Sequence, residues 1–228
     1  MKGLFAYDGL IGRLLLSIFQ FFIVSVQFLA TALLAVLYDR IVGWQATHLA
    51  VWLGALALLP IGPGVYAVLA AMRDFLAEGG YPGAPIRRFW RAYRDGATRL
   101  WWWWLGVAAF AVLLGYNAAL YGESAIVFAG IVIGAALVVV ASVAVCCAVL
   151  LGVRGRPLQL VAAAFGSASR RPHAVVAWLF VLMAVAGASA IPVIGPSLAL
   201  FLPALAGWAI LIVNAAAGVD SKLAAAAA

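Results

Sequence analysis

The chain has 228 residues, of which 68% are apolar and only 9% are charged, and its mean hydropathy is +1.16. A soluble domain of this size could not hide so much apolar side chain from water, so the composition excludes a cytosolic enzyme or a secreted domain and predicts an integral membrane protein. A net charge of +7 favours cytoplasmic loops that lie against an anionic leaflet over binding to nucleic acid.

Five runs without charge are long enough to cross a bilayer, since a spanning helix needs roughly 20 apolar residues. The last run contains a turn with two prolines and a glycine at residues 190–196, so it is expected to hold two helices. The sequence therefore predicts an all-α bundle of six transmembrane helices in a single domain, residues 1–220. The expected spans are 14–37, 44–61, 100–121, 125–151, 174–191 and 197–217.

The positive charges predict how this bundle is oriented, because loops rich in Lys and Arg stay in the cytoplasm. With the N-terminus inside, Arg40 alone among the fourteen Lys and Arg residues lies outside. Both termini are therefore expected to be cytoplasmic. Residues 221–228, Ser-Lys-Leu followed by five alanines, resemble an appended tail and are expected to lie outside the fold.

The second span is expected to end or kink at Pro60-Ile61-Gly62-Pro63, where two prolines interrupt the helix, and residues 62–99 then form a cytoplasmic segment. Within it, residues 86–94 have the spacing of an amphipathic helix with Phe89 and Trp90 on its aromatic face. Each arginine adds roughly 1 kcal/mol of attraction to an anionic surface. The candidate contacts to anionic lipid or to a partner are Arg73, Arg87, Arg88, Trp90, Arg91, Arg94 and Arg99. The sequence favours a role of the arginines as topology determinants and lipid anchors over a specific partner site.

The expected spans contain no Asp, Glu, Lys or Arg, so ion-coupled transport and proton pumping lack their usual intramembrane charges. His48 and His173 fall on opposite sides of the membrane, and Cys146 and Cys147 are adjacent small apolar residues on the fourth span. We therefore expect no metal site and no cofactor. Hydrolase and nucleotide-binding motifs are missing as well, which indicates that the chain is not an enzyme.

Neutral polar side chains do occur inside the spans, including Asn117 in the third and Asn214 in the sixth. Four more fall within an arc of about 80° on the first span. They are Ser17, Gln20, Gln27 and Thr31. Such residues either form hydrogen bonds between helices or line a path for a neutral polar ligand such as a sugar, for which Gln20, Gln27 and Asn117 are the candidates. Residues 192–196 are similar in sequence to Pro60–Pro63, and this short similarity would fit an inverted three-helix repeat.

The segment Leu59-Pro60-Ile61-Gly62-Pro63-Gly64-Val65-Tyr66-Ala67, followed by Phe89-Trp90-Arg91-Ala92-Tyr93-Arg94, resembles the YesL-like family of bacterial membrane proteins. The resemblance covers roughly residues 3–106, with Pro60, Gly62 and Pro63 as the matching turn. This chain lacks the Thr usually found before the Gly-Pro. Family members commonly lie beside genes for carbohydrate ABC transporters and glycoside hydrolases, so the resemblance implies a role in sugar uptake at the bacterial cytoplasmic membrane and supplies no catalytic residues.

Three functional hypotheses follow from these features. The leading one is a non-enzymatic accessory or regulatory protein that contacts the permease or ATPase subunit of a carbohydrate ABC transporter through residues 73–99. The alternative is a small permease or channel for a neutral polar solute, built from the inverted repeat. A third is a membrane enzyme acting on lipid-linked sugars, for which the outer face offers only Asp39, Arg40, His48 and Glu123. The Ala- and Gly-rich fourth to sixth spans would suit a monomer or a homo-oligomer.

Overall fold

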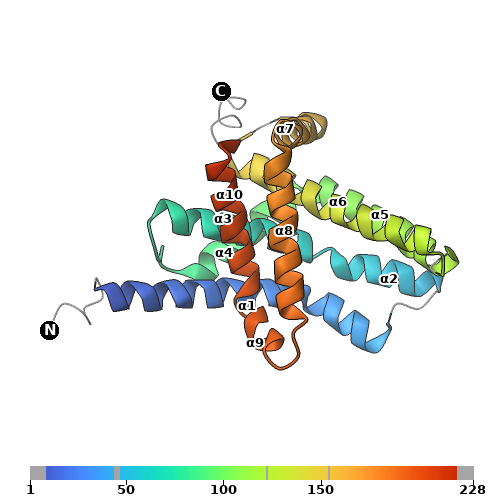
Figure 1. Cartoon of the computed structure of the whole chain (residues 1–228), viewed down its shortest axis with the longest axis horizontal. Helices are drawn as coiled ribbons and strands as arrows, with labels where there is room; N and C mark the ends of the chain where they lie inside the picture. Colours follow the sequence, from blue (N-terminus) through green and yellow to red (C-terminus); the bar gives the residue numbers. More distant parts are fainter. Residues whose placement is uncertain (1–8, 44–46, 122, 154, 220–228) are drawn as a thin grey trace.

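The computed structural model describes residues 9–43, 47–121, 123–153 and 155–219. These residues form α-helices joined by turns, with no β-strand among them, which confirms the all-α prediction (Figure 1). The helices are α1 (Leu10–Ile41), α2 (His48–Leu58), α3 (Ile61–Ala77), α4 (Pro85–Arg99), α5 (Trp101–Tyr121), α6 (Ala125–Leu150), α7 (Pro157–Ser169), α8 (Pro172–Ser189), α9 (Gly195–Ala199) and α10 (Leu202–Ala216).

Five helical stretches are long and apolar enough to cross a membrane, which makes the chain a multi-pass membrane protein. They are Ile11–Ile41, His48–Ala77, Trp101–Tyr121, Ala125–Leu150 and Pro172–Ser189. The sixth expected span, 197–217, is divided instead into α9 and the 15-residue α10. Helix length alone therefore does not establish a sixth crossing. The division falls just before Pro203, which lies in the first turn of α10, where a proline is well tolerated.

The second span differs from the prediction. The helix is interrupted at residues 59–60, as expected, but it resumes at Ile61, so that α2 and α3 form one apolar stretch, His48–Ala77. Pro60 is the N-cap of α3 and Pro63 lies in its first turn, where the missing N–H of proline breaks no helical hydrogen bond. The prolines therefore interrupt the helix, and the apolar stretch continues beyond them. Only residues 78–99 of the expected cytoplasmic segment 62–99 lie outside the apolar stretches.

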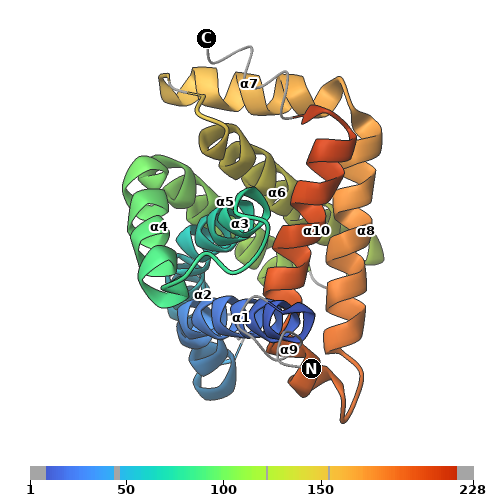
Figure 2. The same cartoon turned by 90° about the vertical axis from the view of Figure 1, so that its left-hand side faces the viewer.

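Helix α3 is the centre of the bundle. It packs against α1, α4, α6 and α10, and Figure 2 shows these helices around it. On one side of α3, Val68 and Met72 pack with Phe89 of α4 and Ala204 of α10. On the other side, Tyr66 and Leu69 belong to a larger cluster that extends along the second half of α6 and includes Trp178 of α8.

Small residues bring helices close to α3. Any Cβ at Gly207 of α10 would overlap the side chain of Val68, and any Cβ at Gly96 of α4 would overlap the ring of Tyr66. Gly79 and Gly83 adopt positive φ in the turn from α3 to α4, a conformation that glycine adopts without steric cost. Helix α4 therefore folds back closely along α3.

The helices do not all run in one direction. Helix α1 follows the long axis of the molecule, whereas α8 and α10 run across it, and both views agree on this (Figures 1 and 2). Helix α7 lies over the end of the bundle where α8 begins. Since α1 and α8 are crosswise, they cannot both stand upright in one bilayer, and a membrane normal between the two directions tilts each helix.

Candidate functional site

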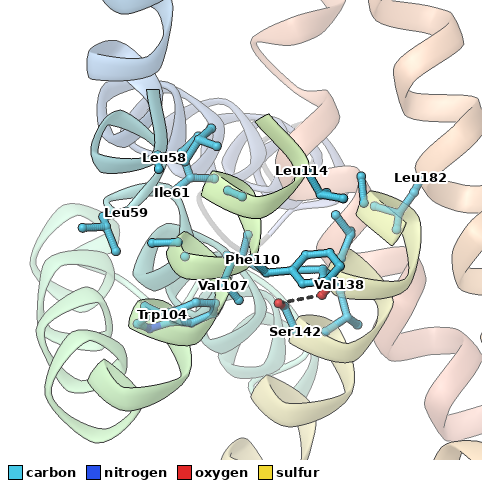
Figure 3. A pocket seen from close by; sticks show the side chains of 18 of the residues that line it. Leu58, Leu59, Ile61, Trp104, Val107, Phe110, Leu114, Val138, Ser142 and Leu182 are labelled. Carbon is cyan, nitrogen blue, oxygen red and sulfur yellow. Dashed lines mark hydrogen bonds between the residues drawn. The ribbon is translucent and has the colours of Figure 1, made fainter. Parts of the chain in front are cut away.

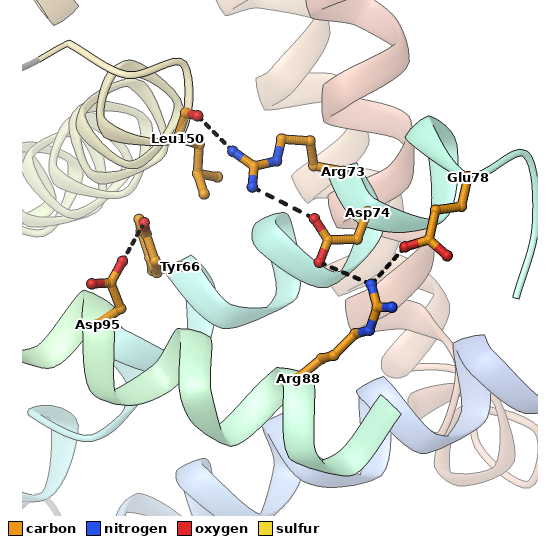
Figure 4. A network of polar contacts seen from close by, with 7 residues as sticks. All are labelled: Tyr66, Arg73, Asp74, Glu78, Arg88, Asp95 and Leu150. Atoms are coloured by element: carbon orange, nitrogen blue, oxygen red, sulfur yellow. Dashed lines mark hydrogen bonds and ion pairs between the residues drawn. The ribbon is translucent and has the colours of Figure 1, made fainter. Parts of the chain in front are cut away.

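The acidic groups around α4 are used to hold that helix in place (Figure 4). The Nη1 atom of Arg88 lies 2.6 Å from Oε1 of Glu78 and 3.8 Å from Oδ2 of Asp74, so α4 is paired with the end of α3. Farther along α4, the hydroxyl of Tyr66 donates a hydrogen bond to Oδ2 of Asp95 at 3.1 Å. Asp95 also pairs with Arg99, which lies 2.7 Å away.

Arg73 connects α3 to the end of α6. Its Nη1 atom donates a 2.6 Å hydrogen bond to the backbone oxygen of Leu150, and its Nη2 atom lies 3.5 Å from Oδ1 of Asp74. Helix C-termini leave backbone carbonyls without helical partners and carry a partial negative charge, so a guanidinium at this position is stabilising. Arg73, Arg88 and Arg99, three of the predicted contact residues, thus make contacts within the protein.

The other predicted contact residues form an outward stripe on α4, which we call the arginine stripe: Arg87, Trp90, Arg91 and Arg94. Their spacing of three, four and seven residues places them on one side of the helix. All are exposed, Trp90 by 43%. The three guanidinium groups form no ion pair or hydrogen bond with the part of the chain that the structure describes. The stripe therefore presents uncompensated positive charge around an indole.

The aromatic residues of α4 are divided differently from the prediction. Phe89, which was expected beside Trp90 on an outward aromatic face, is fully buried between α1, α3 and α10. Tyr93 contacts Trp90 with 5.2 Å between ring centroids, and partial burial raises the pKa of its phenol. Tyr93 is therefore neutral near pH 7, and the charge of the stripe comes from its arginines.

The predicted turn at Pro60, Gly62 and Pro63 is a packing contact. Gly62 lies directly against the indole of Trp104, and Gly64 lies directly against Oγ1 of Thr31, so a Cβ at either glycine would overlap its neighbour. Pro63 is buried. The turn thus lets α3 enter between α1 and α5.

The residues of the predicted polar path are not brought together. Gln20 and Gln27 are buried on α1, and the Oε1 atom of each lacks a hydrogen-bond partner among the described residues. Asn117 lies near the far end of α5, where its amide donates to the backbone oxygen of Leu113 in the same helix. A continuous polar line from the glutamines to Asn117 is therefore not formed.

A large apolar cavity lies between α5 and α6 on one side and α3, α8 and α10 on the other (Figure 3). Its volume is about 730 Å³. Among the described residues, the side-chain polar atoms that line it belong to Tyr38, Ser142 and Trp104. The hydroxyl of Tyr38 donates to the backbone oxygen of Ala50, and Nε1 of Trp104 donates to that of Gly96. Ser142 donates to the backbone oxygen of Val138 and accepts from Trp103. The cavity therefore suits hydrocarbon better than a polar solute.

Sequence reasoning did not find this cavity. Its walls consist mostly of alanine, glycine, leucine and valine, the same residues that fill a tightly packed membrane interface. Whether such residues touch or leave a space depends on the angle at which their helices cross. The sequence held no signal that distinguishes the two.

A buried polar network joins α6, α8 and α10. The indole nitrogen of Trp178 donates to Oδ1 of Asn214 at 3.0 Å, and Nδ2 of Asn214 lies 3.3 Å from Sγ of Cys147. Of the alternatives open for Asn214, the interhelical hydrogen bond is the one observed. No group of three His, Cys, Asp or Glu side chains within the described residues is arranged to hold a metal ion.

The chain matches no protein-family model, no curated protein and no solved structure. The resemblance to the YesL-like family thus stays a prediction from residues 59–67 and 89–94.

Proposed function

We propose that the chain is a non-enzymatic accessory or regulatory protein of a carbohydrate ABC transporter in the bacterial cytoplasmic membrane, and that the arginine stripe contacts the transporter or the anionic lipid around it. The resemblance to the YesL-like family supports the transporter class. The observation that carries the proposal is the division of the arginines, because Arg88 fastens α4 to the end of α3 and Arg99 pairs with Asp95 within α4, while Arg87, Arg91 and Arg94 are exposed and unpaired among the described residues.

Such a division is typical of a recognition surface held by a rigid support. Arginine forms planar, bidentate contacts to carboxylate and phosphate groups, and an indole adds apolar contact area beside them. Arginine and tryptophan are also the residues that most often dominate protein interfaces. An acidic surface of a permease or ATPase subunit, or the phosphates of anionic lipids next to it, would complement the stripe.

We further infer six membrane crossings with both termini in the cytoplasm. Helix α10 returns beside α8 and is joined to it by the bond between Trp178 and Asn214, so a crossing by α8 favours a return crossing by α10. Its 15 residues span roughly 22 Å at 1.5 Å per residue, and α9 extends this length. In this orientation Arg40 is the exception among the described arginines, and the excess of the others inside fits the positive-inside rule.

Purification of the tagged chain from its native host in mild detergent, followed by mass spectrometry, tests the accessory role. We expect a sugar permease and its ATPase in near-stoichiometric amounts, and we expect Arg87→Gln/Arg91→Gln to lose them. The matched control is Arg13→Gln/Arg170→Gln, which removes two exposed arginines elsewhere and should keep the partners. If wild-type protein retains no transporter subunit in either detergent or nanodiscs, the proposal is wrong.

The alternative, a small permease for a neutral polar solute, is favoured by one observation. The two glutamine oxygens on α1 are buried and unpaired among the described residues, and a polar ligand could supply their hydrogen bonds. Replacing both Gln20 and Gln27 by leucine would abolish solute flux in proteoliposomes under this hypothesis while the protein still folds. Unchanged co-purification of transporter subunits by the same variant would support the accessory role instead.

A further inference from the structure

We propose that the apolar cavity between α5, α6 and α10 binds one acyl chain of a membrane phospholipid. This inference does not depend on the accessory role, since it concerns a different part of the molecule from the arginine stripe. It rests on the chemistry of the cavity walls, on their continuity with the outer surface and on the medium that surrounds a membrane protein.

The walls offer contact to hydrocarbon, and the polar side chains among the described lining residues already have hydrogen-bond partners. Tyr38, Trp104 and Ser142 already donate hydrogen bonds to backbone oxygens, so a polar ligand would gain no partner on entering and would lose its own solvation. The volume of about 730 Å³ lies within the range of roughly 300–1,000 Å³ that is usual for ligand pockets. An apolar, flexible ligand fits these walls best.

The cavity is continuous with the apolar surface of the protein. It is partly open, and Phe110 of α5 and Val139 of α6, which line it, are 36% and 45% exposed. Figure 3 shows Phe110 and Leu114 of α5 and Leu182 of α8 among the side chains that line it. A chain can thus enter sideways from the bilayer between α5, α6 and α8, without crossing a polar barrier.

The surrounding medium decides which hydrocarbon enters. Phospholipid acyl chains are the solvent of the apolar outer surface, so their local concentration is far above that of any other lipid and mass action favours their binding. Packing inside membranes relies on van der Waals contact, which an unfilled cavity forfeits along its walls. A bound acyl chain supplies those contacts and stabilises α8 and α10 against α5 and α6.

A phospholipid that carries a photoreactive group in its acyl chain tests the proposal in vesicles of phosphatidylethanolamine and phosphatidylglycerol. We expect cross-links on Val107, Leu114 and Val138, which line the cavity and are half-buried, and the cavity variant Ala111→Phe should abolish them. The matched control is Ala109→Phe, two residues away on the same helix at an exposed position that does not line the cavity, and it should keep them. Ala135→Phe fills the cavity from α6 and serves as the second variant should Ala111→Phe fail to fold.

Stability measurements give an independent readout. Delipidated wild-type protein should gain thermal stability when phosphatidylglycerol is added, whereas Ala111→Phe, with its cavity filled, should gain little. Equal cross-linking of the wild type and both cavity variants would overturn the proposal. Retention of a polyprenyl lipid in place of phospholipid during purification, detected by native mass spectrometry, would overturn the assignment to an acyl chain.

Discussion

Among single residues, Asn214 illustrates how neutral polar groups are used inside this bundle. Its carboxamide accepts from Trp178 and contacts Cys147, so one side chain joins three helices. A buried donor that loses its acceptor keeps its desolvation penalty, which makes the removal of one partner costlier than the bond itself is worth. Asn117 differs, because its amide donates only within its own helix.

We expect Asn214→Leu to lower the free energy of unfolding by about 1–3 kcal/mol, because Nε1 of Trp178 would be left buried and unpaired. Denaturant unfolding in detergent micelles, followed by tryptophan fluorescence, measures the change. Asn117→Leu is the matched control and should unfold like wild type. Equal losses of unfolding free energy in both variants would show that the network between α6, α8 and α10 adds no stability beyond that of an asparagine bonded within its own helix.

Gly62 is a second residue whose small size matters. The ring of Trp104 occupies the space that a Cβ would need. We expect Gly62→Ala to destabilise the protein by about 1–3 kcal/mol, the usual cost of overpacking. Gly106 has nothing within 4 Å of the corresponding position, so Gly106→Ala should be neutral or slightly stabilising. Thermal unfolding of both variants compares them, and the turn is not a packing contact if they behave alike.

At the scale of elements, α4 depends on α3 for its position. Phe89 inserts between α1, α3 and α10, Gly96 lies against Tyr66, and Arg88 pairs with the acidic end of α3. Phe89 and Gly96 are buried and set the packing, while Arg88 is half-buried and adds electrostatic attraction. The arginine stripe is rigid because the opposite face of the same helix is packed.

We expect Arg88→Gln to loosen the N-terminal turns of α4 without unfolding the protein. The Arg88 side chain is 36% exposed, so solvent screens its ion pairs and their loss costs at most about 1 kcal/mol. Hydrogen exchange of the α4 amides should therefore accelerate, and high salt should produce a similar acceleration in wild type. Arg87→Gln, one residue away and without an ion pair in the described chain, should leave exchange unchanged; faster exchange there would contradict the division of the arginines.

At the scale of the whole molecule, α1 and α8 run crosswise, so the direction of the helices alone does not fix the orientation of the protein in the membrane. Charge distribution and helix pairing support one orientation, in which the turn between α5 and α6 is outside and the end of α7 is inside. The native Cys146 and Cys147 are both buried, so a cysteine introduced at the surface is the one that reacts with a bulky reagent.

We expect Glu123→Cys to react with a membrane-impermeant maleimide in intact cells. Arg94→Cys and Arg170→Cys should react only after the cells are permeabilised, because the proposed topology places them in the cytoplasm. The native chain is the control for background labelling. Labelling of Arg170→Cys in intact cells would mean that α8 and α10 do not cross as proposed.

How far the sequence predicts the fold and the site can be seen at particular residues. The apolar runs anticipated the helices α1, α5, α6 and α8, because a chain in hydrocarbon must satisfy its backbone hydrogen bonds within each helix. The polar arc on α1 was expected to face protein or water, and Gln20, Gln27 and Thr31 are indeed buried. The helix is interrupted at Pro60 as expected, but it resumes at Ile61, because proline is tolerated at the first turn of a helix.

The sequence by itself determined that this is a helical, multi-pass membrane protein and where its positive charges lie along the chain. Composition and hydropathy are sums over consecutive residues, so they do not depend on which segments pack together. The tertiary structure decided which arginines are paired, which face of α4 is buried, that α3 is the core, and that a cavity opens beside α5. These properties depend on what lies opposite each side chain. That is set by helix crossings between segments far apart in the sequence, where a single glycine or indole decides how closely two backbones approach.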